Sequence, residues 1–215
     1  MLELSGVEKQ GLLYQGKAKE MYATTNPEVL WVHYMDQVTA LNGKRKVRMA
    51  DKGKVNCAIS SQLFTDLRTQ GIENHFIEQL GPTDQLVQRV QIIPLETVVR
   101  NYASGSFVKR YQVNYLQKFE QPVIEFFYKN DALDDPFLND DDALALGVAT
   151  SNQITEIRKL ARQVNQHLIQ IFTKMNVQLV DFKLEFGLTT AGDVILADEL
   201  SPDNCRLVDM NTKES

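Results

Sequence analysis

Two strand-like stretches, LVDFKLEFG at residues 179–187 and VILADELSPD at residues 194–203, decide the fold of this chain. Apolar and charged residues alternate in the first stretch, which is the period of a β-strand with one face in the core and the other face charged. The segment TTAGD between the two stretches has the composition of a turn. The sequence therefore predicts an antiparallel hairpin with Asp181, Lys183 and Glu185 on its charged face.

The register of this hairpin carries a functional prediction. If the turn is centred between Ala191 and Gly192, Glu185 lies directly opposite Asp198. Like charges in that position destabilise a sheet, so two facing carboxylates indicate a cation between them. Oxygen ligands favour Mg²⁺ or Mn²⁺, and Mg²⁺ is usually held by one or two carboxylates together with substrate phosphates. The alternative is a solvated acidic hairpin whose register is shifted by one residue, and these residues alone do not decide between the two.

The composition is that of an ordinary globular protein. The 215 residues, 43% hydrophobic and 24% charged, suffice for one large core or two modest lobes. A net charge of −5 argues against nucleic acid or an anionic membrane as the main partner, so any anion site must be local. Cys57 and Cys205 are too few for a disulfide framework, and neither a secretory signal nor a long apolar run is present. We therefore expect a cytoplasmic protein.

Short strands separated by turns are expected over residues 11–35, where they form an antiparallel meander. Within it, Gly16, Lys17, Ala18 and Lys19 place two lysines beside a flexible glycine at a hairpin bend. Backbone N–H groups and ammonium groups in such a bend could contact a polyphosphate. The spacing is not that of a Walker A loop, and a basic turn on a surface hairpin is the alternative interpretation.

A polar loop and a helix follow the meander. Residues 36–48 are turn-rich and end in a basic run, which is either solvated or in contact with an anionic substrate. Apolar residues then recur every fourth position over 55–67, which predicts an amphipathic helix with Gly71 as its C-terminal stop.

Strand character returns from residue 72 to residue 99, with an interruption at Pro94. The apolar segment 91–95 is where a two-lobed nucleotide enzyme would hold adenine against backbone groups. We therefore place the boundary between an N-terminal lobe, residues 1–92, and a C-terminal lobe, residues 93–215.

A strand that ends near Asn101 runs into Ser104, Gly105 and Ser106 and then into a short helix. Free N–H groups and hydroxyls at such a point can bind an anion. Arg100, just before it, could grip a carboxylate or phosphate with its planar guanidinium group. The alternative is a serine-capped helix beside an exposed arginine.

Two further helices are expected in the second half of the chain. The aspartates at 140–142 suit the cap and first turn of a short helix that ends near Gly147, because the helix dipole favours negative charge there. Thr150 and Ser151 could cap the longest helix, whose apolar positions from 154 to 175 trace one face.

Five motifs occur in order along the chain: GKAKEMY at 16–22, VVRN at 98–101 with SGS at 104–106, KND at 129–131, DFKLEFG at 181–187, and DELSPD at 198–203 with Arg206. Together they resemble the SAICAR synthetase (phosphoribosylaminoimidazole-succinocarboxamide synthase) family over nearly the whole chain. The resemblance implies an α+β fold with two lobes, antiparallel sheets and a bound ATP, distantly similar to kinases and ATP-grasp enzymes.

The resemblance also implies an ATP-dependent ligase of de novo purine biosynthesis. Such an enzyme joins the carboxylate of carboxyaminoimidazole ribonucleotide (CAIR) to the amine of L-aspartate, through an acyl phosphate, and releases ADP and phosphate. The implied cofactors are ATP and Mg²⁺, and the implied partners are these small substrates, without nucleic acid or membrane, in a homodimer.

Roles for individual residues follow from the same resemblance. Glu185 and Asp198 would hold Mg²⁺, and Glu185 would contact ATP together with Gly16, Lys17, Ala18 and Lys19. The substrate-binding residues would be Arg100, Ser104, Gly105, Ser106, Lys129, Asp131 and Arg206. The catalytic residues would be Lys183, Asp181 and Asp203, with Asp203 suggested as the group that takes a proton from the amine.

Two departures from the family pattern keep alternatives open. Asn42 stands where members often carry an acidic residue, and members continue into further C-terminal helices beyond the position of Ser215. One alternative is a nucleotide-binding protein of the same fold without activity. Another is a kinase-like phosphotransferase, although the absence of His-Arg-Asp and Asp-Phe-Gly triplets argues against a protein kinase.

Overall fold

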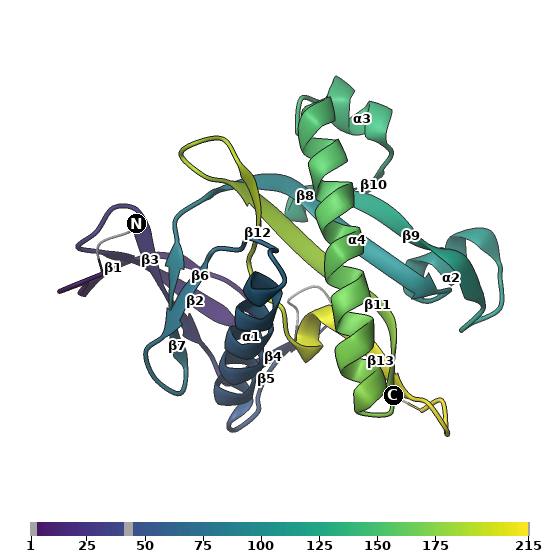
Figure 1. Cartoon of the computed structure of the whole chain (residues 1–215), viewed down its shortest axis with the longest axis horizontal. Helices are drawn as coiled ribbons and strands as arrows, with labels where there is room; N and C mark the ends of the chain where they lie inside the picture. The colour runs from purple at the N-terminus through teal and green to yellow at the C-terminus, as the bar shows by residue number, and fades with distance from the viewer. Residues whose placement is uncertain (1–3, 41–44, 215) are drawn as a thin grey trace. The chain divides into compact units, whose positions relative to one another are not determined.

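The computed structural model describes residues 4–40 and 45–214 and divides the chain into two compact units (Figure 1). One unit comprises Met1–Gln70 and Asn74–Val90, and the other comprises Gly71–Glu73 and Gln91–Ser215. The chain therefore leaves the first unit briefly at residues 71–73 before it returns. Asn42, in the predicted polar loop, lies outside the described residues.

The first unit is built on an antiparallel sheet with the strand order β1-β2-β3-β7-β6. Its strands are β1 (Lys9–Gln15), β2 (Lys19–Thr24), β3 (Val29–Tyr34), β6 (Phe76–Gln79) and β7 (Asp84–Gln88). The short strands β4 (Gln37–Ala40) and β5 (Arg45–Arg48) form a separate hairpin. The predicted meander is confirmed, because β1, β2 and β3 pair in succession.

Helix α1 (Lys52–Thr69) packs against this sheet and ends before Gly71, whose φ of +75° confirms the predicted stop. The buried face agrees with the predicted stripe only in its second half. Leu63 and Leu67 are buried as predicted, but Val55 is 51% exposed, and Cys57 and Phe64 are fully buried outside the stripe. Positions four apart drift around a helix of 3.6 residues per turn, so a stripe at that spacing cannot stay on one face.

Helix α1 approaches strand β3 closely at Gly53. A Cβ atom on Gly53 would lie 2.5 Å from the carbonyl oxygen of Tyr34, well inside van der Waals contact. The backbone N–H of Gly53 also donates a hydrogen bond to Asp36 Oδ1 at 3.0 Å. The glycine is thus required by the packing of the first unit.

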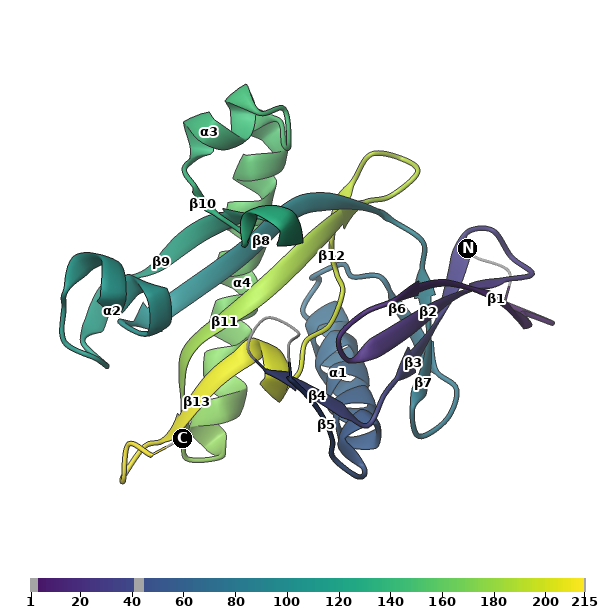
Figure 2. The ribbon, with the colours of Figure 1, turned by 180° about the vertical axis from the view of Figure 1, so that it is seen from behind.

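The second unit is built on a sheet with the strand order β10-β9-β8-β11-β12, in which β13 also pairs with β11 (Figure 2). Its strands are β8 (Gln91–Tyr102), β9 (Lys118–Tyr128), β10 (Phe137–Leu138), β11 (Val177–Leu188), β12 (Val194–Ala197) and β13 (Cys205–Asp209). The stretch from which the fold was predicted therefore forms the strand with most neighbours.

Pro94 does not interrupt a strand, contrary to the prediction. It lies inside β8, and its carbonyl oxygen accepts a hydrogen bond from the backbone N–H of Lys129 at 3.1 Å. Proline lacks only the donor, so a position where the carbonyl alone is needed tolerates it.

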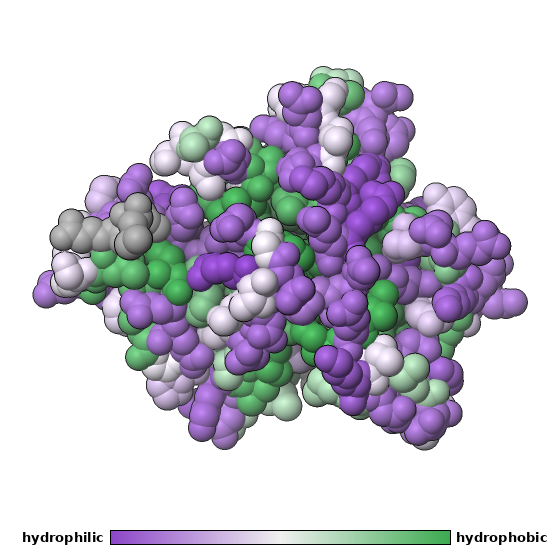
Figure 3. Space-filling view, viewed as in Figure 1, coloured by the Kyte–Doolittle hydropathy of each residue, from purple (hydrophilic) through white to green (hydrophobic). Residues whose placement is uncertain are grey.

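Helix α4 (Ser151–Lys174) covers the apolar face of this sheet, and its outward face is mainly hydrophilic (Figure 3). Thr150 caps the helix as predicted, with a reciprocal bond to Gln153. Val164 of the helix and Phe182 of β11 are almost completely buried. In the described part of the chain, no helix is long and apolar enough to cross a membrane.

Short helices complete the second unit: α2 (Gly105–Tyr111), α3 (Asp140–Ala145) and the 3₁₀ turns η1 (Asp131–Leu133) and η2 (Pro202–Asn204). The aspartates at 140–142 form the first turn of α3 as predicted, and Asn139 caps it.

The register of the β11–β12 hairpin differs from the predicted one by one residue. Glu185 pairs with Ala197, and Leu188 pairs with Val194. The loop of residues 189–193 is therefore centred on Ala191 rather than between Ala191 and Gly192. Asp198 lies just beyond the last paired residue and adopts a left-handed conformation, with φ of +61°.

Candidate active site

One face of strands β8 and β11 carries a row of charged residues. Asp181 pairs directly with Arg100 across the two strands, and Glu185 pairs with Glu96. Lys183 lies between the two acidic residues of β11. Asp181 is 6%, Glu185 2% and Arg100 4% exposed. This charged face is therefore buried, which the interpretation as a solvated acidic hairpin does not allow.

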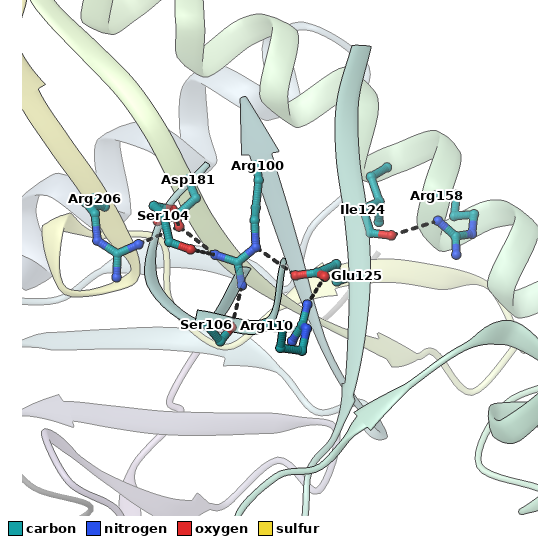
Figure 4. A network of polar contacts seen from close by, with 9 residues as sticks. All are labelled: Arg100, Ser104, Ser106, Arg110, Ile124, Glu125, Arg158, Asp181 and Arg206. Atoms are coloured by element: carbon teal, nitrogen blue, oxygen red, sulfur yellow. Dashed lines mark hydrogen bonds and ion pairs between the residues drawn. The ribbon is translucent and has the colours of Figure 1, made fainter. Parts of the chain in front are cut away.

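Arg100 lies at the centre of a polar network (Figure 4). Its Nη1 donates to Asp181 Oδ2 at 2.7 Å, and its Nε donates to Glu125 Oε2 at 2.7 Å. Its Nη2 donates to Ser106 Oγ at 3.0 Å. Bonds on three sides fix the plane of the guanidinium group.

Two more arginines join this network. Arg206 Nη1 donates to Asp181 Oδ2 at 2.6 Å, and Arg110 forms an ion pair with Glu125. The hydroxyl of Ser104 also donates to Asp181. Three guanidinium groups, including that of Arg100, thus face two buried carboxylates, and one positive charge is left over. A cluster of this kind suits a phosphate or a carboxylate.

Gly105 allows Arg206 to take its place. A Cβ atom on Gly105 would lie 3.2 Å from Arg206 Nη1 and 3.3 Å from Nη2. The φ of Gly105 is +52°, a conformation that side-chain-bearing residues rarely adopt. The sequence predicts that Gly105 binds substrate, and the geometry shows that it leaves room for the guanidinium group of Arg206.

A cavity of about 360 Å³ lies beside the arginine cluster. It is lined by Asp181, Pro202, Asp203, Asn204, Cys205, Arg206 and Leu207. Asp203 is exposed at this cavity and belongs to η2. Burial raises the pKa of the Cys205 thiol to about 12, so Cys205 stays protonated and is a poor nucleophile.

Lys183 occupies the other half of the charged row. Its Nζ donates to Glu96 Oε1 at 2.7 Å and to Glu185 Oε1 at 2.9 Å. Lys129 forms an ion pair with the second oxygen of Glu185. Burial lowers the pKa of Lys183, but the negative charges of Glu185, Glu96 and Asp198 outweigh it and hold the pKa above its ordinary value.

Two facing carboxylates do occur in the sheet, but on a different pair of strands from the one predicted. They are Glu185 and Glu96 on β11 and β8, and the ammonium group of Lys183 lies between them. Facing acids are therefore accompanied by a positive charge, as predicted, but the prediction that Asp198 lies opposite Glu185 is wrong.

The acidic residues nevertheless fit a divalent cation. The carboxylates of Glu96, Glu185 and Asp198 all raise the pKa of Lys183. With the positive charges of Lys183 and Lys129, these three carboxylates form a cluster that has one negative charge in excess. The described residues contain no group of three His, Cys, Asp or Glu side chains arranged to hold a metal ion. One or two carboxylates, with phosphate oxygens for the rest, is the ligand set that Mg²⁺ usually takes.

Lys129 and Asp131 flank the charged row. Lys129 reaches Glu185, as described above. Asp131 opens the turn η1, which Asn130 caps by accepting a hydrogen bond from Ala132 N at 3.1 Å. Lys129 is thus joined to the row through Glu185.

The Gly16–Lys19 bend belongs to the first unit. Gly16 N donates to the carbonyl of Lys19 at 2.8 Å, which closes the turn between β1 and β2. The carbonyl of Lys17 accepts from Gln37 Nε2 at 2.7 Å, and that of Ala18 accepts from Met35 N at 2.8 Å. The bend is therefore held to the segment that follows β3.

The segment predicted to hold adenine, residues 91–95, is the beginning of β8. It borders a cavity of about 560 Å³, whose lining also includes Leu188 and residues 147–151. All of these residues belong to the second unit.

Sequence analysis missed three charged residues of this site: Glu96, Arg110 and Glu125. Glu96 could have been found, because it lies four residues before Arg100 on the same face of a strand. Glu125 and Arg110 carry no such signal. Their contacts depend on how β9 and α2 are placed beside β8.

Comparison with known proteins identifies the family of this chain. The sequence model of the family described as SAICAR synthetase matches residues 12–215. Phosphoribosylaminoimidazole-succinocarboxamide synthase of Lactiplantibacillus plantarum is 62% identical over 211 residues, which cover 98% of this chain and 87% of that protein. The corresponding protein of Enterococcus faecalis is 52% identical, over 97% of this chain and 88% of its own length.

Solved structures give the same result. The crystal structure of the synthase from Ehrlichia chaffeensis matches with a TM-score of 0.91 and 42% identity, over 95% of this chain and 87% of that one. A SAICAR synthetase in complex with ADP matches with a TM-score of 0.91 and 40% identity over the same shares. The α+β fold with antiparallel sheets is thus that of the family, and the chain belongs to the SAICAR synthetase family.

Proposed function

We propose that this protein catalyses the ATP-dependent joining of CAIR and L-aspartate to give SAICAR, ADP and phosphate. The observation that carries the proposal is the continuous row of charged residues on β8 and β11, with an arginine cluster at one end and a lysine–carboxylate cluster at the other. The arginine cluster suits an anionic substrate, and the lysine–carboxylate cluster suits the phosphates of a nucleotide with its metal ion. The relative solved with ADP supports nucleotide binding.

The arginine cluster would bind the phosphate or carboxylate groups of CAIR. Arg100 and Arg206 offer planar donors, and Ser106 adds a hydroxyl. Asp181 Oδ2 already accepts bonds from both arginines, so its main task is to hold them in position. Its other carboxylate oxygen would accept from an amino or ribose hydroxyl group of the substrate.

The chemical problem is that a carboxylate does not react with an amine at neutral pH. Transfer of the γ-phosphoryl group of ATP to the CAIR carboxylate would give an acyl phosphate and ADP. The aspartate amine would then attack the acyl carbon, lose a proton and displace phosphate. Catalysis of this kind depends on positioning and on charge neutralisation in a water-poor site.

Lys183 and Lys129 would neutralise the charge that moves with the phosphoryl group. The pKa of Lys183 lies above its ordinary value, so the ammonium group stays charged and does not act as a base. We propose that Asp203 accepts the proton that the aspartate amine loses, because this exposed carboxylate and Asp181 line the same cavity.

Mg²⁺ would be held by Glu185 and Asp198. It supplies Lewis-acid stabilisation and a template for the phosphate oxygens. The contacts of Glu185 with Lys129 and Lys183 would hold its carboxylate in place until the nucleotide arrives.

The family resemblance implies that Gly16, Lys17, Ala18 and Lys19 would contact the ATP phosphates and that the protein would be a homodimer. The lobes at residues 1–92 and 93–215 and the location in the cytoplasm are predictions from the sequence pattern and composition. Light scattering on the purified protein tests the dimer.

An assay of ADP release tests the proposed reaction. We expect release that requires CAIR and L-aspartate together, and succinate, which lacks the amine, should not replace aspartate. Tight ATP binding with no release under any of these conditions would instead indicate a nucleotide-binding protein. Release that depends on ATP and another acceptor would indicate a phosphotransferase.

A further inference from the structure

We infer that Glu125 is a positioning residue of the anion site: its buried carboxylate bridges Arg100 and Arg110 and holds both guanidinium groups toward the same substrate anion. The inference rests on the proposed function, in which the arginine cluster binds CAIR. It adds two residues, Glu125 and Arg110, that the family motifs in the sequence did not indicate.

The two oxygens of Glu125 serve different arginines. Oε2 accepts from Arg100 Nε at 2.7 Å, and Oε1 pairs with Arg110 Nη2. The side chain of Glu125 is 5% exposed, and it reaches the site from β9 rather than from β8 or β11. A buried carboxylate shared in this way sets the distance between two cations that would otherwise repel each other.

Arg110 lies where it can act with Arg100. It follows Ser106 by four residues on α2, so both side chains lie on the same face of the helix. Ser106 accepts a hydrogen bond from Arg100, and Figure 4 shows Arg110 next to Ser106. Glu125 therefore links Arg110 to the same group of donors.

Arg110 also retains donors for a ligand. A guanidinium group has five N–H groups, and among the described residues one of those of Arg110 is bonded to Glu125. Its central carbon lies 4.8 Å from the ring centroid of Phe137 and 5.8 Å from that of Phe127. The rings and the carboxylate together fix the orientation of this side chain.

The substitution Glu125→Gln tests the inference. The amide keeps the shape of the side chain but removes the negative charge and turns an N–H group toward one arginine. We expect the KM for CAIR to rise by about tenfold or more, as is common when a supporting partner is removed. The KM for ATP should change by less than about twofold, because the lysine–carboxylate cluster keeps all its partners.

Glu120→Gln is the matched control. It makes the same chemical change on the same strand, at an exposed position, and should leave every kinetic constant unchanged. Glu125→Asp restores the charge with a shorter reach and should recover most of the affinity for CAIR. If Glu125→Gln does not fold, Glu125→Asp carries the test alone. A KM for CAIR raised by about tenfold or more in Glu125→Asp, at an unchanged melting temperature, would then count against the inference.

Arg110→Met separates bridging from simple support of the fold. The double variant combines Glu125→Gln with Arg110→Met. If Glu125 acts through Arg110, the fold-rise in its KM for CAIR should be smaller than the product of the fold-rises in the two single variants. A fold-rise in the double variant equal to that product would show that the two residues act independently and would overturn the inference. An equal rise in the KM for CAIR, aspartate and ATP, with a lower melting temperature, would make Glu125 a structural residue only.

Calorimetric titration with CAIR, without ATP, keeps this test apart from the proposed reaction. Binding that weakens in Glu125→Gln but not in Glu120→Gln supports the inference even if no turnover is seen. Failure of the wild-type protein to release ADP would refute the proposed function. Equal CAIR affinity in Glu125→Gln and wild type would refute the role of Glu125.

Discussion

Burial and neighbouring charges shift the pKa of Lys183 in opposite directions. Its pKa is raised, so the folded chain keeps the proton at pH values where the unfolded chain releases it. The stability contributed by Lys183 is therefore fully present below pH about 10.5 and is lost as the pH rises further.

Lys183→Met should remove this alkaline dependence. We expect its free energy of unfolding to fall less than that of the wild type above pH about 10.5, as measured by urea denaturation at fixed pH. Lys159→Met, at an exposed position of α4, is the control and should follow the wild-type curve. A wild-type rate profile that shows Lys183 titrating near neutral pH would contradict the assignment.

Glu185→Gln and Asp198→Asn test the metal site. Each should weaken Mg²⁺-dependent ATP binding by at least about tenfold. The fold should survive Asp198→Asn, because asparagine tolerates the left-handed conformation at this position. Isothermal titration with and without Mg²⁺ measures the effect, and Asp193→Asn in the exposed turn is the control. Normal Mg·ATP binding by both variants would show that the metal lies elsewhere.

Gly105→Ala should displace Arg206, because the added Cβ would meet both terminal nitrogens of its guanidinium group. We expect a higher KM for CAIR and a loss of stability of about 1–2 kcal/mol from the left-handed backbone. Gly147→Ala, with φ of +66° and no heavy atom within 4 Å, has a similar backbone cost without the contact. Equal CAIR kinetics in the two variants would exclude a role for Gly105 in placing Arg206.

Among the secondary-structure elements, the β11–β12 hairpin shows what alternation can and cannot predict. Alternating residues identified the apolar and charged faces of β11, because the side chains of a strand point to opposite faces. The register depends on the centre of the turn. The predicted centre was displaced from the observed one, so Asp198 was predicted opposite Glu185, where the structure has Ala197. The pairing of Glu185 with Glu96 lies between strands far apart in sequence, and no local pattern contains it.

Helix α1 provides a test at the scale of an element. Replacing a helical glycine by alanine usually stabilises, by up to about 1 kcal/mol. Gly53→Ala should instead destabilise by about 1–3 kcal/mol, because its Cβ would overlap the Tyr34 carbonyl and push α1 away from β3.

Urea denaturation followed by circular dichroism measures this effect. Ala58→Gly on the exposed face of the same helix should cost only the propensity difference, about 1 kcal/mol. Stabilisation by Gly53→Ala would show that α1 and β3 are farther apart than described.

For the whole molecule, ligand binding should appear as added stability. A ligand that binds only the folded chain adds about 2.7 kcal/mol at a concentration 100 times its Kd. We therefore expect Mg·ATP to raise the melting temperature of the wild type by several degrees and that of Glu185→Gln much less. Differential scanning calorimetry measures both, and an equal rise would contradict the proposed metal site.

The whole chain also shows why the sequence was so informative about function. A net charge of −5 excluded a broad basic surface, yet Arg100, Arg110 and Arg206 form a compact site with one excess positive charge. The ordered motifs indicated the family and two of these arginines. Arg110 and Glu125 were not predicted, because their contacts come from tertiary packing rather than from a motif.

The short excursion of the chain at residues 71–73 has a consequence for biosynthesis. Within the second unit, the carbonyl of Glu73 accepts a hydrogen bond from the backbone N–H of Leu196 at 3.1 Å. During translation, residues 71–73 leave the ribosome long before β12 is made, although domains generally fold as they emerge. The second unit therefore cannot complete its hydrogen bonds on a nascent chain that stops before residue 196, and its final folding step must wait until β12 has been synthesised.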